Sequence, residues 1–69
     1  MERLSKTKLK AAMIDACVGV NQLAQMADVQ PATVSKFLKA DDLPIRLPTL
    51  GKLSRALNIS ANDLIISEV

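Results

Sequence analysis

The chain has 69 residues, a formal net charge of +2 and an isoelectric point near 9.0. A single cysteine and the absence of histidine argue against a disulfide, a cysteine-rich metal site or a histidine-based catalytic centre. No apolar run approaches the ~18 residues of a membrane span, and the N-terminus lacks the apolar core of a signal peptide. We therefore expect one small cytoplasmic domain over residues 1–69, not an enzyme, with no cofactor, metal, membrane or small-molecule partner.

The first helix is predicted from Ser5 to Cys17. Gly19 is expected to end it, since glycine readily takes the left-handed conformation found after helix ends. Cys17 is expected to be a small buried hydrophobe rather than a redox group. The apolar residues of this segment recur at helical spacing on one face: Leu9, Ala12, Met13, Ala16 and Cys17.

A second helix is predicted from Asn21 to Ala27 and a third from Pro31 to Lys39. Pro31 suits the first turn of a helix, and Gln30 before it takes the N-cap position. Two helices joined by about three residues cross steeply, so the later one projects and can enter the major groove of DNA. The residues expected to face inward are Leu23, Ala24, Ala27, Val34, Phe37 and Leu38.

A fourth helix is predicted from about Pro48 to Leu57, with Asn58 as its C-terminal cap and Leu50, Leu53 and Leu57 inward. The stretch "SANDLI" predicts a fifth helix that begins after Ser60 as N-cap, with Asp63 completing an approximate capping box. The segment "ADDLPIRLP" is expected to be a loop, and no strand is expected. The predicted fold class is all-α, a compact bundle of five short helices with a helix-turn-helix.

The quoted motifs resemble those of a known family. "LAQMADV" and "ATVSKFL" are similar to the helix-turn-helix of bacterial and phage repressors. "LPTLGKLSRALNISANDL" resembles the later helices of the Cro/repressor (Xre-like, lambda-repressor-like) family. The resemblance extends from about Leu9 to Leu64. It implies a small sequence-specific transcriptional regulator, repressor-like or Cro-like, that acts at the nucleoid as a homodimer on double-stranded operator DNA. The stand-alone format suggests a phage or mobile element.

The sequence departs from the family pattern in two places. Asp28 stands where the family usually has glycine, and aspartate tolerates the left-handed conformation better than most residues. Pro31 and Ala32 open the recognition helix, and neither side chain can donate a hydrogen bond to a base. Base reading is then assigned to Lys36 on guanine, to Ala32 on a thymine methyl, and to Gln30 and Thr33.

The resemblance also implies phosphate contacts from the ends of the helices. At Asn21 the alternative is a simple N-cap, and at Arg46 it is an exposed loop charge. Along the third helix, the alternative is an ordinary solvated face. The phosphate-binding residues assigned in this way are Asn21, Gln22, Ser35, Lys39, Arg46 and Thr49.

The apolar residues near the C-terminal half exceed what a small core can bury. Leu43, Ile45, Leu47, Ile65, Ile66 and Val69 cannot all point inward. Ile65, Ile66 and Val69 are therefore assigned to a dimer or partner interface. The alternative function is a helix-turn-helix protein-interaction module, a phage or mobile-element modulator or antirepressor that binds another regulator. Basic residues around the third helix would favour DNA, and an apolar face there would favour a protein partner.

Overall fold

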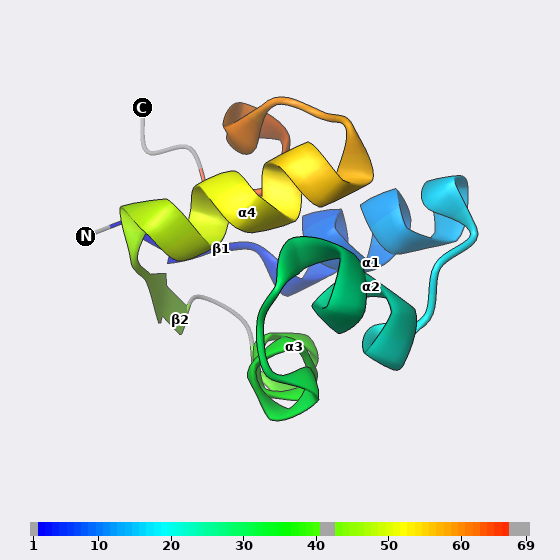
Figure 1. Cartoon of the computed structure of the whole chain (residues 1–69). Helices are drawn as coiled ribbons and strands as arrows, with labels where there is room; N and C mark the ends of the chain where they lie inside the picture. The colour runs from blue at the N-terminus through cyan, green and yellow to red at the C-terminus, as the bar shows by residue number, and fades with distance from the viewer. Residues whose placement is uncertain (1, 41–42, 67–69) are drawn as a thin grey trace.

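The computed structural model describes residues 2–40 and 43–66. Within these ranges the chain forms four α-helices, one 3-10 turn and two short strands (Figure 1). In chain order they are β1 (Glu2–Leu4), α1 (Lys6–Ala16), α2 (Val20–Ala27), α3 (Pro31–Lys39), β2 (Leu43–Ile45), α4 (Leu47–Leu57) and η1 (Ala61–Asp63). The prediction of a mostly helical fold is confirmed. The predictions of a fifth helix and of a fold without strands are wrong, because "SANDLI" forms only η1 and part of "ADDLPIRLP" forms β2.

The two strands bring the N-terminus against the middle of the chain. β1 and β2 are antiparallel neighbours in a two-stranded sheet. On its other edge β1 meets the segment after η1, through a bridge between Leu4 and Ile65 and two flanking backbone hydrogen bonds of 2.8 and 2.9 Å. β1 therefore lies between β2 and the C-terminal segment, and it ties both ends of the described chain to the helices.

The end of α1 differs from the prediction. Cys17, not Gly19, takes the left-handed conformation, with φ of 57°, and its N–H donates to the carbonyl of Ile14. Gly19 has φ of −92° and is the N-cap of α2, two residues beyond the point where the α1 cap closes. Cys17 is exposed rather than buried. It has already left the helix, so the helical spacing that placed it inward no longer applies.

The other helix boundaries lie close to those expected. α2 begins at Val20 and α4 at Leu47, one residue before each predicted start. α3 has the predicted bounds, with Gln30 at its N-cap. Asn58 is confirmed as the left-handed cap of α4, and the Ser60 hydroxyl accepts from the N–H of Asn62 at 3.3 Å.

The core lies where α1, α2, α3 and α4 meet the sheet. The inward residues predicted for the second, third and fourth helices are buried, apart from Leu38, which is half-buried. On α1 only Leu9 and Met13 are buried. Leu4, Ile45 and Leu64 are buried core residues that helical periodicity did not predict.

The structure accounts for part of the apolar surplus. Ile45 is 1% exposed, whereas Leu43, Ile65 and Ile66 are half-buried. Leu47 is 68% exposed. Val69 lies outside the described residues.

Candidate nucleic-acid interface

The corner between α2 and α3 is closed by backbone hydrogen bonds. Asp28 follows α2 with φ of 58°, and the N–H of Val29 donates to the carbonyl of Ala24 at 2.9 Å. This is the pattern of a Schellman cap, in which a left-handed residue turns the chain away from the helix axis. Gln30 is extended, and Pro31 then starts α3. The turn therefore occupies three residues and fixes the direction in which α3 projects.

α3 buries one side and exposes the other. Val34 is fully buried and Phe37 nearly so, and they hold the helix against the core. Ala32 and Lys36 are exposed and four residues apart, so they are neighbours on the same face. This spacing gives α3 one outward strip that presents a methyl group and an ammonium group side by side.

A shallow hollow runs along this strip. Four of the predicted DNA-contacting residues lie together in its lining, together with two residues that the sequence did not assign. The lining is Ala32, Ser35, Lys36, Lys39, Ala40 and Leu43. Leu43 could not be placed from sequence, because its position beside α3 depends on the pairing of β2 with β1.

The remaining predicted base-reading residues lie at the N-terminal end of α3. Gln30 is exposed, and its side chain makes no cap hydrogen bond. Thr33 is half-buried, so less of its side chain is available to a ligand than that of Ala32. Gln30 and Lys36 are thus the polar residues of the predicted base-reading set that are exposed.

The start of α2 is open to an anion. Gly19 is its N-cap and supplies no side-chain oxygen to the first N–H groups, so the alternative of a cap by Asn21 is wrong. Asn21 and Gln22 are both exposed in the first turn. Backbone N–H groups at such a helix start are suited to a phosphate oxygen.

The two residues predicted near the start of α4 differ in exposure. Arg46 is exposed and is the N-cap of α4, with no side-chain cap bond, while Thr49 is half-buried in its first turn. Exposed Leu47 follows Arg46 directly. The Arg46 side chain can therefore extend from the surface at the start of α4, apart from the groups on α3.

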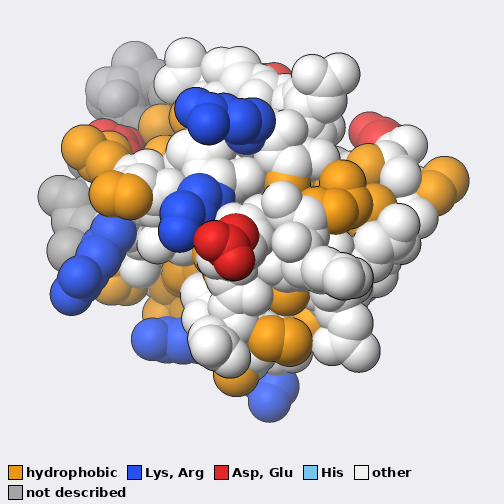
Figure 2. Space-filling model, viewed as in Figure 1, with side chains coloured by type: hydrophobic (Ala, Val, Ile, Leu, Met, Phe, Trp, Pro, Cys, Tyr) orange, Lys and Arg blue, Asp and Glu red, His pale blue; other side chains and the backbone are white. Residues whose placement is uncertain are grey.

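The charge around α3 is mixed with apolar surface. Lys36 and Lys39 lie in its last turns, and in Figure 2 Lys and Arg side chains stand beside apolar ones at the lower edge of the view, over α3. Asp28, the first residue of the corner, lines a separate hollow with Lys52 and Arg55. The face is basic at one end and apolar at the Pro31–Ala32 end.

The predicted interface residues near the C-terminus are partly used by the fold. Ile65 forms the bridge to Leu4, and the N–H of Ile66 donates to the carbonyl of Arg3 at 2.9 Å. Both side chains keep part of their surface exposed. The segment is therefore held against β1, and it leaves only a partial apolar surface.

No group of three or more histidine, cysteine, aspartate or glutamate residues in residues 2–40 and 43–66 could hold a metal ion. Over the same residues, no helix is both long and apolar enough to cross a membrane.

A family model for the Cro/C1-type helix-turn-helix DNA-binding domain matches residues 8–68. No curated protein and no solved structure shows significant similarity to the chain. The match begins within α1 and extends past η1, and it includes the α2–α3 corner whose geometry is described above. The chain therefore belongs to the family of Cro/C1-type helix-turn-helix DNA-binding domains.

Proposed function

We propose that this protein is a small sequence-specific transcriptional regulator, repressor-like or Cro-like, that inserts α3 into the major groove of an operator. The observation that carries the proposal is the outward strip of α3, where Ala32 and Lys36 are exposed on a helix whose direction is fixed by a capped corner. A helix presented in this way fits the major groove, about 12 Å wide. Occupying the operator would block or redirect RNA polymerase.

Each exposed group on the strip has a distinct role in this proposal. Lys36 donates to O6 or N7 of a guanine, and Ala32 contacts a thymine methyl group. Gln30 reaches a base edge at the start of α3, with Thr33 beside it. This set has few hydrogen-bonding groups, so local DNA shape also contributes to the choice of site.

The groups around the strip hold phosphates. Lys39 and Ser35 lie in the same hollow as Lys36, and Arg46 extends from the start of α4. The exposed first turn of α2 supplies Asn21 and Gln22. These contacts orient α3 without reading sequence. Ser35 and Thr49 are weaker candidates, because both are half-buried.

The first experiment is selection of binding sites from random duplex DNA by the purified protein at two salt concentrations. We expect one enriched motif, present as two half-sites about one helical turn apart if the protein binds as a dimer. Recovery of DNA without an enriched motif at either salt concentration would contradict sequence-specific regulation.

Lys36→Ala tests base reading on the selected site. We expect it to weaken specific binding by about 1–3 kcal/mol and to relax the choice at one base pair. Lys10→Ala is the matched control, because it removes the same charge from an exposed position on α1. Equal affinities of the two variants for the selected site would refute the role of Lys36.

Arg46→Ala tests phosphate binding. We expect it to lower affinity for all sequences and to reduce the slope of log K against log salt by about 1. A loss restricted to one sequence would indicate base reading by Arg46 instead.

A second candidate function is a protein-interaction module that binds another regulator, as a phage or mobile-element modulator or antirepressor would. Two observations favour it: the exposed Pro31–Ala32 end of α3 and Leu47, which is 68% exposed. A selection that yields only salt-sensitive, sequence-blind binding, together with a protein partner whose binding Ala32→Glu abolishes, would favour this function over the first.

A further inference from the structure

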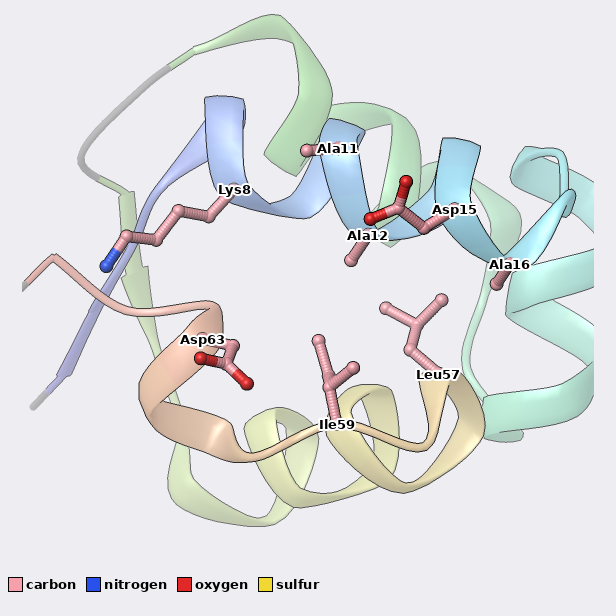
Figure 3. Close-up of a pocket in the computed structure, with 8 residues that line it drawn as sticks. All are labelled: Lys8, Ala11, Ala12, Asp15, Ala16, Leu57, Ile59 and Asp63. Atoms are coloured by element: carbon pink, nitrogen blue, oxygen red, sulfur yellow. The ribbon is translucent and has the colours of Figure 1, made fainter.

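A second hollow lies away from α3, between α1 on one side and the end of α4 with η1 on the other (Figure 3). We call it the α1 groove; it is bounded by residues 8–16 of α1 and by residues 57–63. Leu57 and Ile59 project into it from one wall and Ala12 from the other, so its floor is apolar. Its volume is about 450 Å³, within the range of roughly 300–1,000 Å³ that is typical of ligand pockets.

α1 has two apolar faces, and the core buries one of them. Leu9 and Met13 are its buried residues. Ala12 and Ala16, which helical spacing predicted to face inward, are half-buried and exposed, and with Ala11 they line the α1 groove instead. The described chain therefore leaves the second apolar face of α1 open, with only small apolar side chains on it.

The charges that remain available in the groove are acidic. The Lys8 ammonium points away from the apolar floor and donates to the carbonyl of Ile65 at 3.0 Å. Asp15 on α1 and Asp63 on η1 lie on opposite walls, and both are exposed. Neither carboxylate forms a hydrogen bond or an ion pair with any other described residue.

This acidic character contrasts with the rest of the protein. The groove lining, with one lysine and two aspartates, has a net charge of −1, whereas the whole chain has +2. The two carboxylates repel phosphate groups, so the groove is not a surface for DNA. An occupant that complements it has an apolar surface with positive charge on both sides.

We propose that the α1 groove binds a basic amphipathic helix of another protein. The groove follows α1 from Lys8 to Ala16, which is eight residues or about 12 Å along a helix. This length matches about two turns of a bound helix, whose apolar side chains would pack on Leu57 and Ile59. The alanines of α1 allow the two helix axes to approach closely, since interaxial distance depends on the side chains at the contact.

The two carboxylates determine the charge of the partner. Asp15 and Asp63 would each accept hydrogen bonds from a lysine or arginine beside the apolar row of the partner helix. The groove shares no lining residue with the hollow along α3, and Figure 1 shows η1 and α3 on opposite sides of the molecule. The helix and DNA can therefore bind at the same time, and the proposal does not depend on sequence-specific DNA recognition.

A displayed library of helical peptides tests the proposal on the full chain. Each peptide has two leucines one helical turn apart, and each flanking position is either lysine or glutamate. Lysine should be enriched beside the leucines. The overall charge of the chain favours glutamate, so a preference for lysine requires a local acidic surface. A selection that recovers no lysine-flanked peptide would overturn the proposal.

A steric variant locates the selected lysine-flanked peptide. Ala16→Gln places a longer side chain in the groove from an exposed position, and it should weaken binding more than about tenfold in fluorescence anisotropy. Thr7→Gln is the matched control, since Thr7 is exposed on α1 outside the lining, and it should bind as the wild type does. Circular dichroism verifies that both variants are folded. Equal affinities of the two variants would overturn the proposal.

Charge removal tests the two carboxylates. Asp15→Asn and Asp63→Asn should each weaken binding of the lysine-flanked peptide by about two- to fivefold at low salt, as expected for exposed ion pairs. Asp28→Asn makes the same change at an exposed aspartate outside the groove and should have no effect. Equal affinities of these three variants for the peptide would contradict a basic partner.

Two further results would assign the groove to a different occupant or the peptide to a different surface. Displacement of the peptide by duplex DNA would place it on α3. Self-association of the wild type that Ala16→Gln abolishes, measured by sedimentation equilibrium, would make a second copy of the chain the occupant. Either result would overturn the proposal.

Discussion

Among the described residues, three helices end on a residue in the left-handed conformation, and none of the three is glycine. Cys17, Asp28 and Asn58 have φ of 57°, 58° and 57°. The same backbone conformation therefore occurs with three different side chains in one small protein. We predict that substitution by glycine stabilises the protein most at Cys17, less at Asp28 and least at Asn58.

The size of the effect follows from two opposing terms. An ordinary L-residue in this conformation costs about 1–2 kcal/mol, and asparagine and aspartate are better tolerated. Glycine removes that strain but costs about 0.5–1 kcal/mol through the greater freedom of the unfolded chain. All three side chains are exposed, so the substitutions remove no core contact. The free energy of unfolding should rise by about 0.5–1 kcal/mol for Cys17→Gly, and it should change little for Asn58→Gly.

Urea unfolding followed by circular dichroism measures these changes, and calorimetry gives an independent value. For a domain of this size, 1 kcal/mol corresponds to a shift in Tm of about 4–8 °C. Cys17→Ala is the control, because it removes the thiol and keeps the Cβ atom that causes the strain. Equal stabilisation by alanine and glycine at this position would refute the backbone explanation, as would a loss of stability in Cys17→Gly.

Two further substitutions test other parts of the fold. Ser5→Ala should lower the free energy of unfolding by about 0.5–2 kcal/mol, because buried Ser5 caps α1: its hydroxyl accepts from the N–H of Lys8 at 3.3 Å. Ser60→Ala, at the three-residue η1, is the comparison and should lower the free energy of unfolding less. Equal losses for the two variants in urea unfolding would argue against the cap. Pro44→Thr should increase self-association measured by light scattering. Pro44 pairs with Arg3, and at this position the backbone groups of β2 point toward its free edge. Proline has no N–H to donate there, whereas threonine has one. Unchanged scattering at high concentration would show that this edge is not protected by Pro44.

The helices were predictable because their information is local. α3 shows this best, since Pro31 marks its first turn and Val34 and Phe37 fall one helical turn apart on the buried side. The same is true of α4, where Leu50, Leu53 and Leu57 repeat at helical spacing and are all buried. Periodicity and capping chemistry act over four or five residues, so a single sequence contains them.

The sheet was not predictable, because its information is distributed between distant segments. β1 and β2 have three residues each, too few to show an alternating pattern. Leu4 and Ile45 are buried only because the N-terminus pairs with the segment before α4. Leu43 reaches the hollow along α3 for the same reason, so part of the candidate site also lay beyond sequence analysis.

A dimer should bind DNA more tightly than a single copy. One copy of α3 offers few groups to the bases, so its affinity for a single half-site should be low. A second copy bound to the same duplex would present a second α3 at high effective concentration once the first is bound. A duplex with two half-sites should therefore bind much more tightly than a duplex with one half-site.

Lys36→Ala should weaken binding to both duplexes, because Lys36 lies on the proposed reading face of α3. Lys10→Ala should bind both duplexes as the wild type does, because Lys10 lies on α1. Fluorescence anisotropy with the two duplexes separates the two effects. Equal affinities of the wild type for one and two half-sites would mean that the two copies of α3 do not act together.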